Sequence, residues 1–193
     1  MSGGDLTAAL LPVVRALQRL GVAYYVTGSV ASSAHGIARA SLDVDLVAEL
    51  TVQKAEPLAD LLDAAYYTPR GQMRVAAAEH RSFNLIHLET MFKIDVFVSK
   101  DRPFDREVAR RARAQMIDQS PAAPHVLVAS AEDTVLAKLE WFRRGGETSE
   151  RQWWDIVGVL RVNPAVDTGY MKRWSAELGV ADLLVQALAQ AAQ

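Results

Sequence analysis

The sequence predicts an α/β (α+β) fold, in which a mixed β-sheet core is flanked by helices and followed by a small C-terminal helical bundle. Over the first two thirds of the chain, short runs rich in β-branched and aromatic residues alternate with helical segments, a pattern typical of a sheet covered by helices. The composition changes after Pro121, and from Ser130 the pattern is helical to the end. We therefore expect a core over residues 1–129 and a helical subdomain over residues 130–193.

The chain has 193 residues, half of them hydrophobic, which is enough for one sizeable core. Its 21 Lys and Arg against 23 Asp and Glu give a formal net charge of -2, so no global field attracts nucleic acid or an acidic membrane. With no cysteine, disulfides and thiolate metal sites are excluded. No run reaches the roughly 18 apolar residues of a membrane span and no leader pattern opens the chain, so we expect a soluble, cytoplasmic protein without a membrane partner.

The first half of the chain predicts a helix, a strand, a short helix and a second strand. Apolar residues follow helical spacing over residues 6–20, with Asp5 as the expected cap, Gly21 as the stop, and Pro12 expected to kink the helix or move its start. "VAYYV" is the first strand, and it ends at a Thr-Gly-Ser turn. "SVASSAHG" is a short helix, and "SLDVDLVAEL" alternates as the second strand.

The second half predicts one more covering helix, three strands and four final helices. The helix is expected between residues 52 and 66, and the strands are "FNLIHLE", "FKIDVFVS" and "PHVLVAS". Ser130 and Ser149 each begin a pattern typical of a capping box, which marks the start of a helix. Gly145-Gly146, Asn163-Pro164 and Gly179 are expected to separate the helices.

Three aspartates in predicted strands suggest a metal site. Residues i and i+2 of a strand face the same side, so Asp43 and Asp45 project together, and two unpaired carboxylates this close call for a cation. Mg²⁺ prefers such oxygen ligands together with substrate phosphates. Asp95 is a third strand acid, and if its strand neighbours the strand of Asp43 and Asp45, three carboxylates converge and can hold two metal ions roughly 3.5 to 4 Å apart.

The Gly28-Ser29 turn lies between the first strand and the short helix. A glycine there lets backbone amides approach a ligand, the helix N-terminus favours anions, and the Ser29 hydroxyl can donate to a phosphate oxygen. The same pair can also be an ordinary turn. A triphosphate held here would direct its metal-binding oxygens toward Asp43 and Asp45.

These residues resemble the nucleotidyltransferase superfamily with a polymerase β-like core. "GSVASSAHGIARASLDVDL" is similar to its turn and D-x-D pair, and "KIDVFV" to its third acid. The spacing is most similar to AbiEii toxin-type nucleotidyltransferases, in which a His-Gly-x-x-Arg segment precedes the pair. The residues that carry this likeness are His35, Gly36, Arg39, Ser41, Asp43 and Asp45. The tail is similar as well, with one helix bearing Lys138 and the next bearing Asp155.

The resemblance spans residues 22–160 and implies a two-metal transfer of a nucleoside monophosphate from an NTP to a hydroxyl of RNA (tRNA included), a protein or a small molecule, as a toxin with an antitoxin partner. It implies Mg²⁺ or Mn²⁺ as the cofactor, held by Asp43, Asp45 and Asp95, with Asp95 also assisting deprotonation. The sequence departs from the AbiEii pattern at Ser29, where a second glycine is common, and by its short C-terminal region.

Several other polar residues have two interpretations. Arg39 could contact the triphosphate or fix the loop before the strand, and the second is favoured. Lys138 could reach a phosphate or pair with Asp155, and neither is preferred. His35 is expected to cap a helix end. Ser41 and Asp155 are expected to support the site.

Two further patterns lie outside these motifs. Positive charges at helical spacing could bind RNA phosphates, but neighbouring acids favour an ion-paired helix; the charges are Arg102, Arg106, Arg110 and Arg113. The tryptophans Trp141, Trp153, Trp154 and Trp174 are expected in the core. Two rival functions follow: a non-catalytic protein that binds a nucleotide or a partner, and a plain nucleic-acid-binding domain that uses the arginines.

Overall fold

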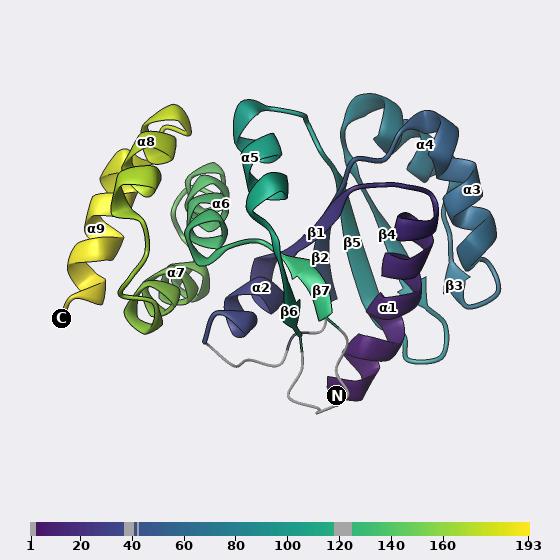
Figure 1. Cartoon of the computed structure of the whole chain (residues 1–193), viewed down its shortest axis with the longest axis horizontal. Coiled ribbons are helices and arrows are strands. Elements are labelled where there is room, and N and C mark those ends of the chain that lie inside the picture. The colour runs from purple at the N-terminus through teal and green to yellow at the C-terminus, as the bar shows by residue number, and fades with distance from the viewer. Residues whose placement is uncertain (1–2, 37–40, 42, 118–124) are drawn as a thin grey trace.

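The computed structural model describes residues 3–36, 41, 43–117 and 125–193, and it forms a mixed sheet flanked by helices (Figure 1). The strands are β1 Tyr24–Thr27, β2 Asp43–Ala48, β3 Tyr66–Tyr67, β4 Ser82–His87, β5 Lys93–Val98, β6 Arg113–Met116 and β7 His125–Val128. The helices are α1 Gly3–Arg19, α2 Gly28–Ala34, α3 Val52–Leu62, α4 Arg70–Glu79, α5 Pro103–Arg111, α6 Ala131–Arg144, α7 Glu150–Val162, α8 Thr168–Glu177 and α9 Ala181–Ala191. The predicted fold class is confirmed.

The strand order across the sheet is β3-β4-β5-β2-β1-β7-β6. Strand β2 lies at the middle of this order, antiparallel to β1 on one side and parallel to β5 on the other. The expectation that the strands of Asp45 and Asp95 are neighbours is confirmed.

Alternation along the central strands separates a buried face from an open one. Every second residue of β2 and β5 is buried, including Val44, Leu46, Ile94 and Val96. These side chains join α1, α3 and α4 in one hydrophobic cluster, and Figure 1 shows the three helices together on one side of the sheet. The intervening residues of β2 and β5, which include all three aspartates, therefore point to the other face.

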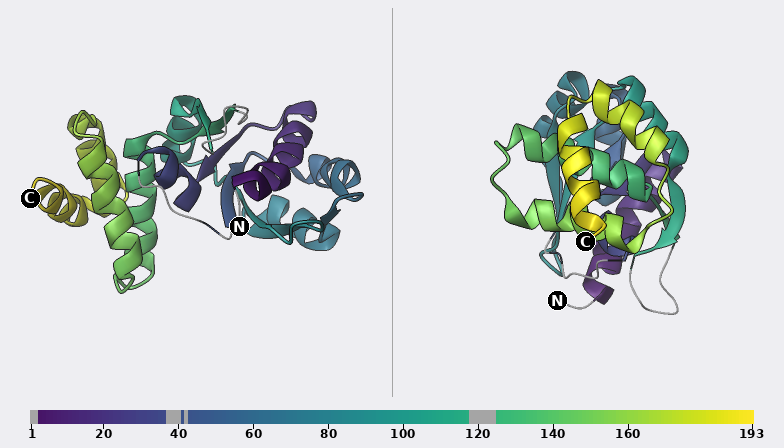
Figure 2. Two further views of the ribbon diagram at one scale, coloured as in Figure 1. Left: turned by 90° about the horizontal axis from the view of Figure 1, so that it is seen from below. Right: turned by 90° about the vertical axis from the view of Figure 1, so that its left-hand side faces the viewer.

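A second hydrophobic cluster forms around the C-terminal helices. Val135, Leu139 and Ile156 are fully buried in it, together with α8 and α9 residues. Helix α5 contributes Phe104 and Val108, so the bundle shares its core with an earlier part of the chain. Figure 2 shows α6 to α9 at one end of the molecule and α1 and α3 at the other.

Several helix ends lie where the sequence patterns predict them. The side chains of Ser130 and Ser149 accept hydrogen bonds from the backbone N–H groups of Asp133 and Gln152, as the capping patterns predict. Gly21 ends α1 with a positive φ of 61°. The expectation that Asp5 caps α1 is wrong, and Pro12 does not move the start of the helix, because α1 begins at Gly3 and runs on past both residues; Leu10, Val13 and Leu17 on its buried face stabilise it.

Three elements escaped sequence analysis, namely β3, α4 and β6. Strand β3 has only two residues, and three of the four residues of β6 are exposed, so neither carries an apolar alternation. Arg113 begins β6, so the expectation that it continues the helical face of Arg110 is wrong.

Among the helices that the structure describes, none is both long and apolar enough to cross a membrane.

The expectation that the tryptophans lie in the core is wrong for two of them. Trp153 and Trp174 are partly buried and pack on the second cluster. Trp141 and Trp154 are 51% and 55% exposed. Trp141 packs edge-on against Phe97 of β5 with ring centroids 5.9 Å apart, so it lies beside the open face of the sheet.

Candidate active site

Two neighbouring strands bring the three aspartates together on the open face. Strands β2 and β5 run parallel with Asp45 opposite Asp95 and Asp43 opposite Lys93. Burial, together with the charges of Asp43 and Asp95, raises the pKa of Asp45 to about 6. Lys138 and Lys93 partly offset this effect. The carboxylates therefore repel one another in a partly desolvated site, as the D-x-D spacing predicted.

The backbone of Gly28 lies against the Asp45 carboxylate. Gly28 follows Thr27, which pairs with Asp45 across β1 and β2, and its φ of +66° is in the left-handed region. A Cβ at this position would lie 1.8 Å from Asp45 Oδ2. Only glycine fits this approach, so the turn and the acid pair are parts of one local structure.

The other predicted residues of the turn and loop lie around the same edge of the sheet. Ser29 is in the first turn of α2, and its carbonyl accepts a hydrogen bond from the Ser33 hydroxyl. Ser41 Oγ donates to Asp43 Oδ1 at 3.1 Å and so restrains that carboxylate. Arg39 lies outside the described residues.

Lys93 is a charged neighbour that sequence analysis did not single out. Its Nζ lies 2.8 Å from Asp95 Oδ2 and 3.8 Å from Asp43 Oδ2. The hydrogen bond to Asp95 raises the pKa of Lys93. The alternation of "KIDVFV" placed Lys93 on the face of Asp95, but its contact with Asp43 depends on the register of two strands far apart in sequence.

The donor set suits a hard divalent cation in chemistry, because all three candidate ligands are carboxylates and their repulsion is of the kind that a bound cation relieves. Over the described ranges, however, no three acidic or histidine side chains are grouped closely enough to hold an ion. The Lys93 ammonium lies between two of the acids. The strand register thus brings the three aspartates to the same face of the sheet, as expected. The lysine side chain, however, occupies part of the space between two of the carboxylates.

Lys138 and Asp155 form a buried ion pair between α6 and α7. Lys138 Nζ lies 2.9 Å from Asp155 Oδ2, and their side chains are 11% and 9% exposed. Lys138 also lowers the pKa of Asp45 through its charge. The pair therefore belongs to the bundle and is within electrostatic reach of the acids.

His35 and Gly36 join the end of α2 to the bundle. His35 Nε2 lies 2.7 Å from the carbonyl oxygen of Ala129, and Asn163 Nδ2 donates to the His35 carbonyl at 2.8 Å. Gly36 has a φ of +112°, and a Cβ there would lie 2.3 Å from Val162 Cγ1. The His-Gly pair thus has a structural contact with α7 that the sequence alone did not reveal.

The arginines of α5 are ion-paired, as the neighbouring acids predicted. Arg102 contacts Glu140 at 2.6 Å and Asp105 at 2.8 Å. Arg106 contacts Asp101, and Arg110 contacts Glu107. The charge of this helix is therefore balanced locally.

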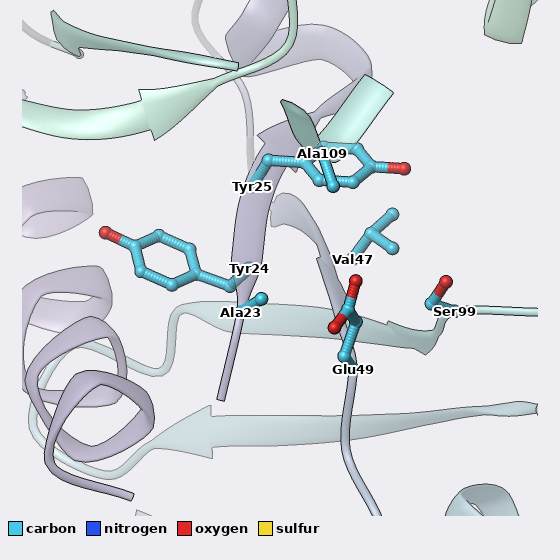
Figure 3. Close-up of a pocket in the computed structure, with 7 residues that line it drawn as sticks. All are labelled: Ala23, Tyr24, Tyr25, Val47, Glu49, Ser99 and Ala109. Atoms are coloured by element: carbon cyan, nitrogen blue, oxygen red, sulfur yellow. The ribbon is translucent and has the colours of Figure 1, made fainter. Parts of the chain in front are cut away.

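Two hollows of the described structure lie away from the acids. One, shown in Figure 3, is about 10 Å³ and lies near the other end of β2, where Tyr25 and Val47 point toward Ala109 while Tyr24 points away. It has room for about one water molecule. Another, of about 500 Å³, is lined by residues of the bundle, Trp154 among them. The candidate site lies on the face of β2 and β5 that carries the three aspartates, where the Asp95 side chain is 16% exposed.

The sequence matches, over residues 15–190, the family described as nucleotidyl transferase AbiEii toxin of type IV toxin–antitoxin systems. No curated protein matches it.

Solved nucleotidyltransferase structures are similar in fold. The antibiotic-resistance factor ANT(2'')-Ia in solution is 9% identical, with a TM-score of 0.58 and coverage of 96% of this chain and 97% of that chain. An antigenic nucleotidyltransferase-like protein from Paracoccidioides brasiliensis is 17% identical, with a TM-score of 0.57 and coverage of 98% and 94%. ANT(2'')-Ia in complex with adenylyl-2''-tobramycin has a TM-score of 0.52 at 10% identity, with coverage of 90% and 96%. At these identities the likeness shows the fold alone.

Proposed function

The chain belongs to the AbiEii nucleotidyltransferase family, and from this premise we propose that it transfers a nucleoside monophosphate from an NTP to a hydroxyl of an acceptor, in a reaction that depends on Mg²⁺ or Mn²⁺. The observation that carries the proposal is the arrangement of Gly28, Asp45 and Asp95. The Gly28 backbone lies against Asp45, and Asp45 lies opposite Asp95 on the next strand. A phosphate-binding turn and a set of carboxylates in this order suit phosphoryl chemistry.

The triphosphate is proposed to bind on the β1 side of the site. Gly28 and Ser29 would hold its oxygens through backbone N–H groups and the serine hydroxyl. Arg39 and Lys138 are the proposed cationic contacts. Asp155 would keep Lys138 in position through the 2.9 Å ion pair. We propose that residues 1–129 carry the chemistry and that residues 130–193 contribute this pair.

The acceptor is proposed to approach from the β5 side, because an in-line displacement places the attacking oxygen opposite the leaving pyrophosphate. The acceptor oxygen forms a bond to the α-phosphorus, its proton passes to the Asp95 carboxylate, and the bond to the bridging oxygen of pyrophosphate breaks. Asp43, Asp45 and Asp95 are the proposed ligands of the divalent ion, with Ser41 orienting Asp43. Such an ion would neutralise phosphate charge and favour the ionised acceptor hydroxyl.

The acceptor is proposed to be RNA, tRNA included, a protein or a small molecule. The description of the family supports a role as the toxin of a toxin–antitoxin pair, and hence an antitoxin partner. We assign the reaction to the cytoplasm, where NTPs are available.

The test is a transfer assay with each α-labelled NTP, Mg²⁺ or Mn²⁺, and either no added acceptor, total tRNA or cell extract. We expect labelled product and released pyrophosphate, and their loss in the Asp43→Asn, Asp45→Asn double variant. Asp60→Asn is the matched control, because Asp60 is 66% exposed and lies on α3, away from the open face. If no acceptor is labelled and no pyrophosphate is released, while the protein still binds NTP, the non-catalytic binder is the better explanation.

A further inference from the structure

Four charged side chains form a square on the open face of the sheet, and one of them is a cation. The β2 and β5 register sets Asp43 opposite Lys93 and Asp45 opposite Asp95. The Lys93 ammonium hydrogen-bonds Asp95 at 2.8 Å and lies 3.8 Å from Asp43. It thus bridges the two diagonally placed carboxylates, in the space where an ion shared by them would lie.

The surroundings favour this position of the lysine. The Asp95 side chain is only 16% exposed, so its negative charge is poorly compensated by solvent. Lys93 precedes Asp95 by two residues and shares its face, so a rigid strand directs the lysine stem toward the acids. Its side chain is 42% exposed at the outer edge of the site, which leaves its other side open to a bound ligand.

The charges in the square match one divalent ion better than two. Three ionised carboxylates and one ammonium carry two net negative charges, which a single divalent ion neutralises. A second ion bound to Asp95 would lie a few ångströms from the ammonium, and at this distance like charges repel by more than thermal energy even at the effective dielectric of a protein surface.

Resting on the proposed function, we propose that Lys93 replaces the acceptor-side metal ion, so that the chain binds one divalent ion, at Asp43 and Asp45, and Lys93 supplies the positive charge beside Asp95. Lys93 is then a positioning residue: it holds the Asp95 carboxylate where that group can accept the acceptor proton. This narrows the ligand set given under the proposed function to Asp43 and Asp45, and it replaces the pair of ions that the family resemblance implies with one ion and one lysine.

The test counts bound ions directly. The full chain is saturated with an α,β-methylene NTP analogue and titrated with Mn²⁺ at pH 7.5, and bound Mn²⁺ is measured by electron paramagnetic resonance. We expect one Mn²⁺ per wild-type chain and two per Lys93→Met chain. Lys93→Arg keeps the charge and should keep one, as should Lys100→Met, whose exposed side chain lies beyond the end of β5. Thermal unfolding of each variant shows that it is folded.

The outcomes of the Mn²⁺ titration distinguish a failure of the role given to Lys93 from a failure of the proposed function. Two Mn²⁺ of similar affinity in the wild type, or one in both the wild type and Lys93→Met, would overturn the role of Lys93 and leave the proposed transfer intact. No Mn²⁺ in the wild type would overturn the metal-dependent function itself, and the role of Lys93 with it.

Discussion

At the scale of single residues, Gly28 is the position with the least freedom to change. Its left-handed φ of +66° strains any residue with a Cβ, and that Cβ would overlap the Asp45 carboxylate. We expect Gly28→Ala to lower the free energy of unfolding by about 1–3 kcal/mol and to abolish nucleotide transfer, because the acid must move. Urea denaturation and the labelled-NTP assay measure the two effects.

Gly146 is the matched control for this substitution. It has a φ of +74°, but nothing lies within 4 Å of where its Cβ would be. Gly146→Ala therefore carries the backbone strain of about 1 kcal/mol without the clash, and it should transfer nucleotide like the wild type. Equal losses of activity in the two variants would contradict the role given to the contact between Gly28 and Asp45.

Asp45 makes stability depend on pH. Its pKa is about 6 in the folded protein against an ordinary value of 3.8. Between these values the folded protein keeps a proton that the unfolded chain has lost, so stability falls as pH rises through this window, by up to about 3 kcal/mol. Asp45→Asn removes the effect. In metal-free urea denaturation, the variant should match the wild type near pH 4 and exceed it above pH 6.

A constant difference between Asp45→Asn and the wild type across this range would show that the carboxylate is not destabilised by its surroundings. Because the neighbouring acids raise this pKa, a bound divalent ion should lower it. Mg²⁺ with NTP should therefore reduce the advantage of the variant above pH 6.

Residue-scale prediction from sequence succeeded where the chemistry is local. The shared face of Asp43 and Asp45 follows from the period of a strand. The contact of Lys93 with Asp43 and that of Gly36 with Val162 join residues distant in sequence, and their geometry depends on strand register and helix packing. Neither strand register nor helix packing can be predicted from a local pattern in a single sequence.

At the scale of secondary-structure elements, those with a strong hydrophobic periodicity could be predicted from the sequence, and those without it could not. Strands β2 and β5 alternate cleanly because one face is buried against helices, and the sequence revealed both. Strand β6 is an exposed edge strand whose pairing with β7 stabilises it, so its own residues carry little signal. Helix α1 tolerates Pro12 because tertiary packing outweighs a lost hydrogen bond.

The α6–α7 ion pair gives a test at this scale. Lys138 and Asp155 are both nearly buried, so removing one partner leaves an uncompensated charge. We expect Lys138→Met or Asp155→Leu alone to lower the free energy of unfolding by about 3–5 kcal/mol. The double variant should recover most of that loss, because two apolar side chains can pack where the charges were.

The double variant also separates stability from function. If Lys138 contacts the triphosphate, the stable double variant should still show a raised KM for NTP. Strictly additive losses of stability in a double-mutant cycle would contradict the pairing.

At the scale of the whole molecule, the two hydrophobic clusters do not divide the chain at residue 129. The second cluster draws Tyr25 from β1 and Phe104, Val108 and Ala112 from α5 and its end. These residues belong to the first 129 residues, so the C-terminal helices complete their core only with the rest of the chain. We therefore expect the change of composition after Pro121 to mark a change of architecture and not the edge of a self-sufficient domain.

This arrangement predicts that the chain unfolds as one unit. All four tryptophans lie within residues 130–193, so their fluorescence reports the bundle, whereas far-ultraviolet circular dichroism reports every helix and strand. We expect the urea midpoints of the two signals to coincide, because losing the sheet removes Tyr25 and α5 from the bundle core. An isolated fragment of residues 130–193 should lack a cooperative transition. A fragment that unfolds cooperatively, or tryptophan fluorescence that changes at a distinct midpoint, would show that the bundle is stable without the core.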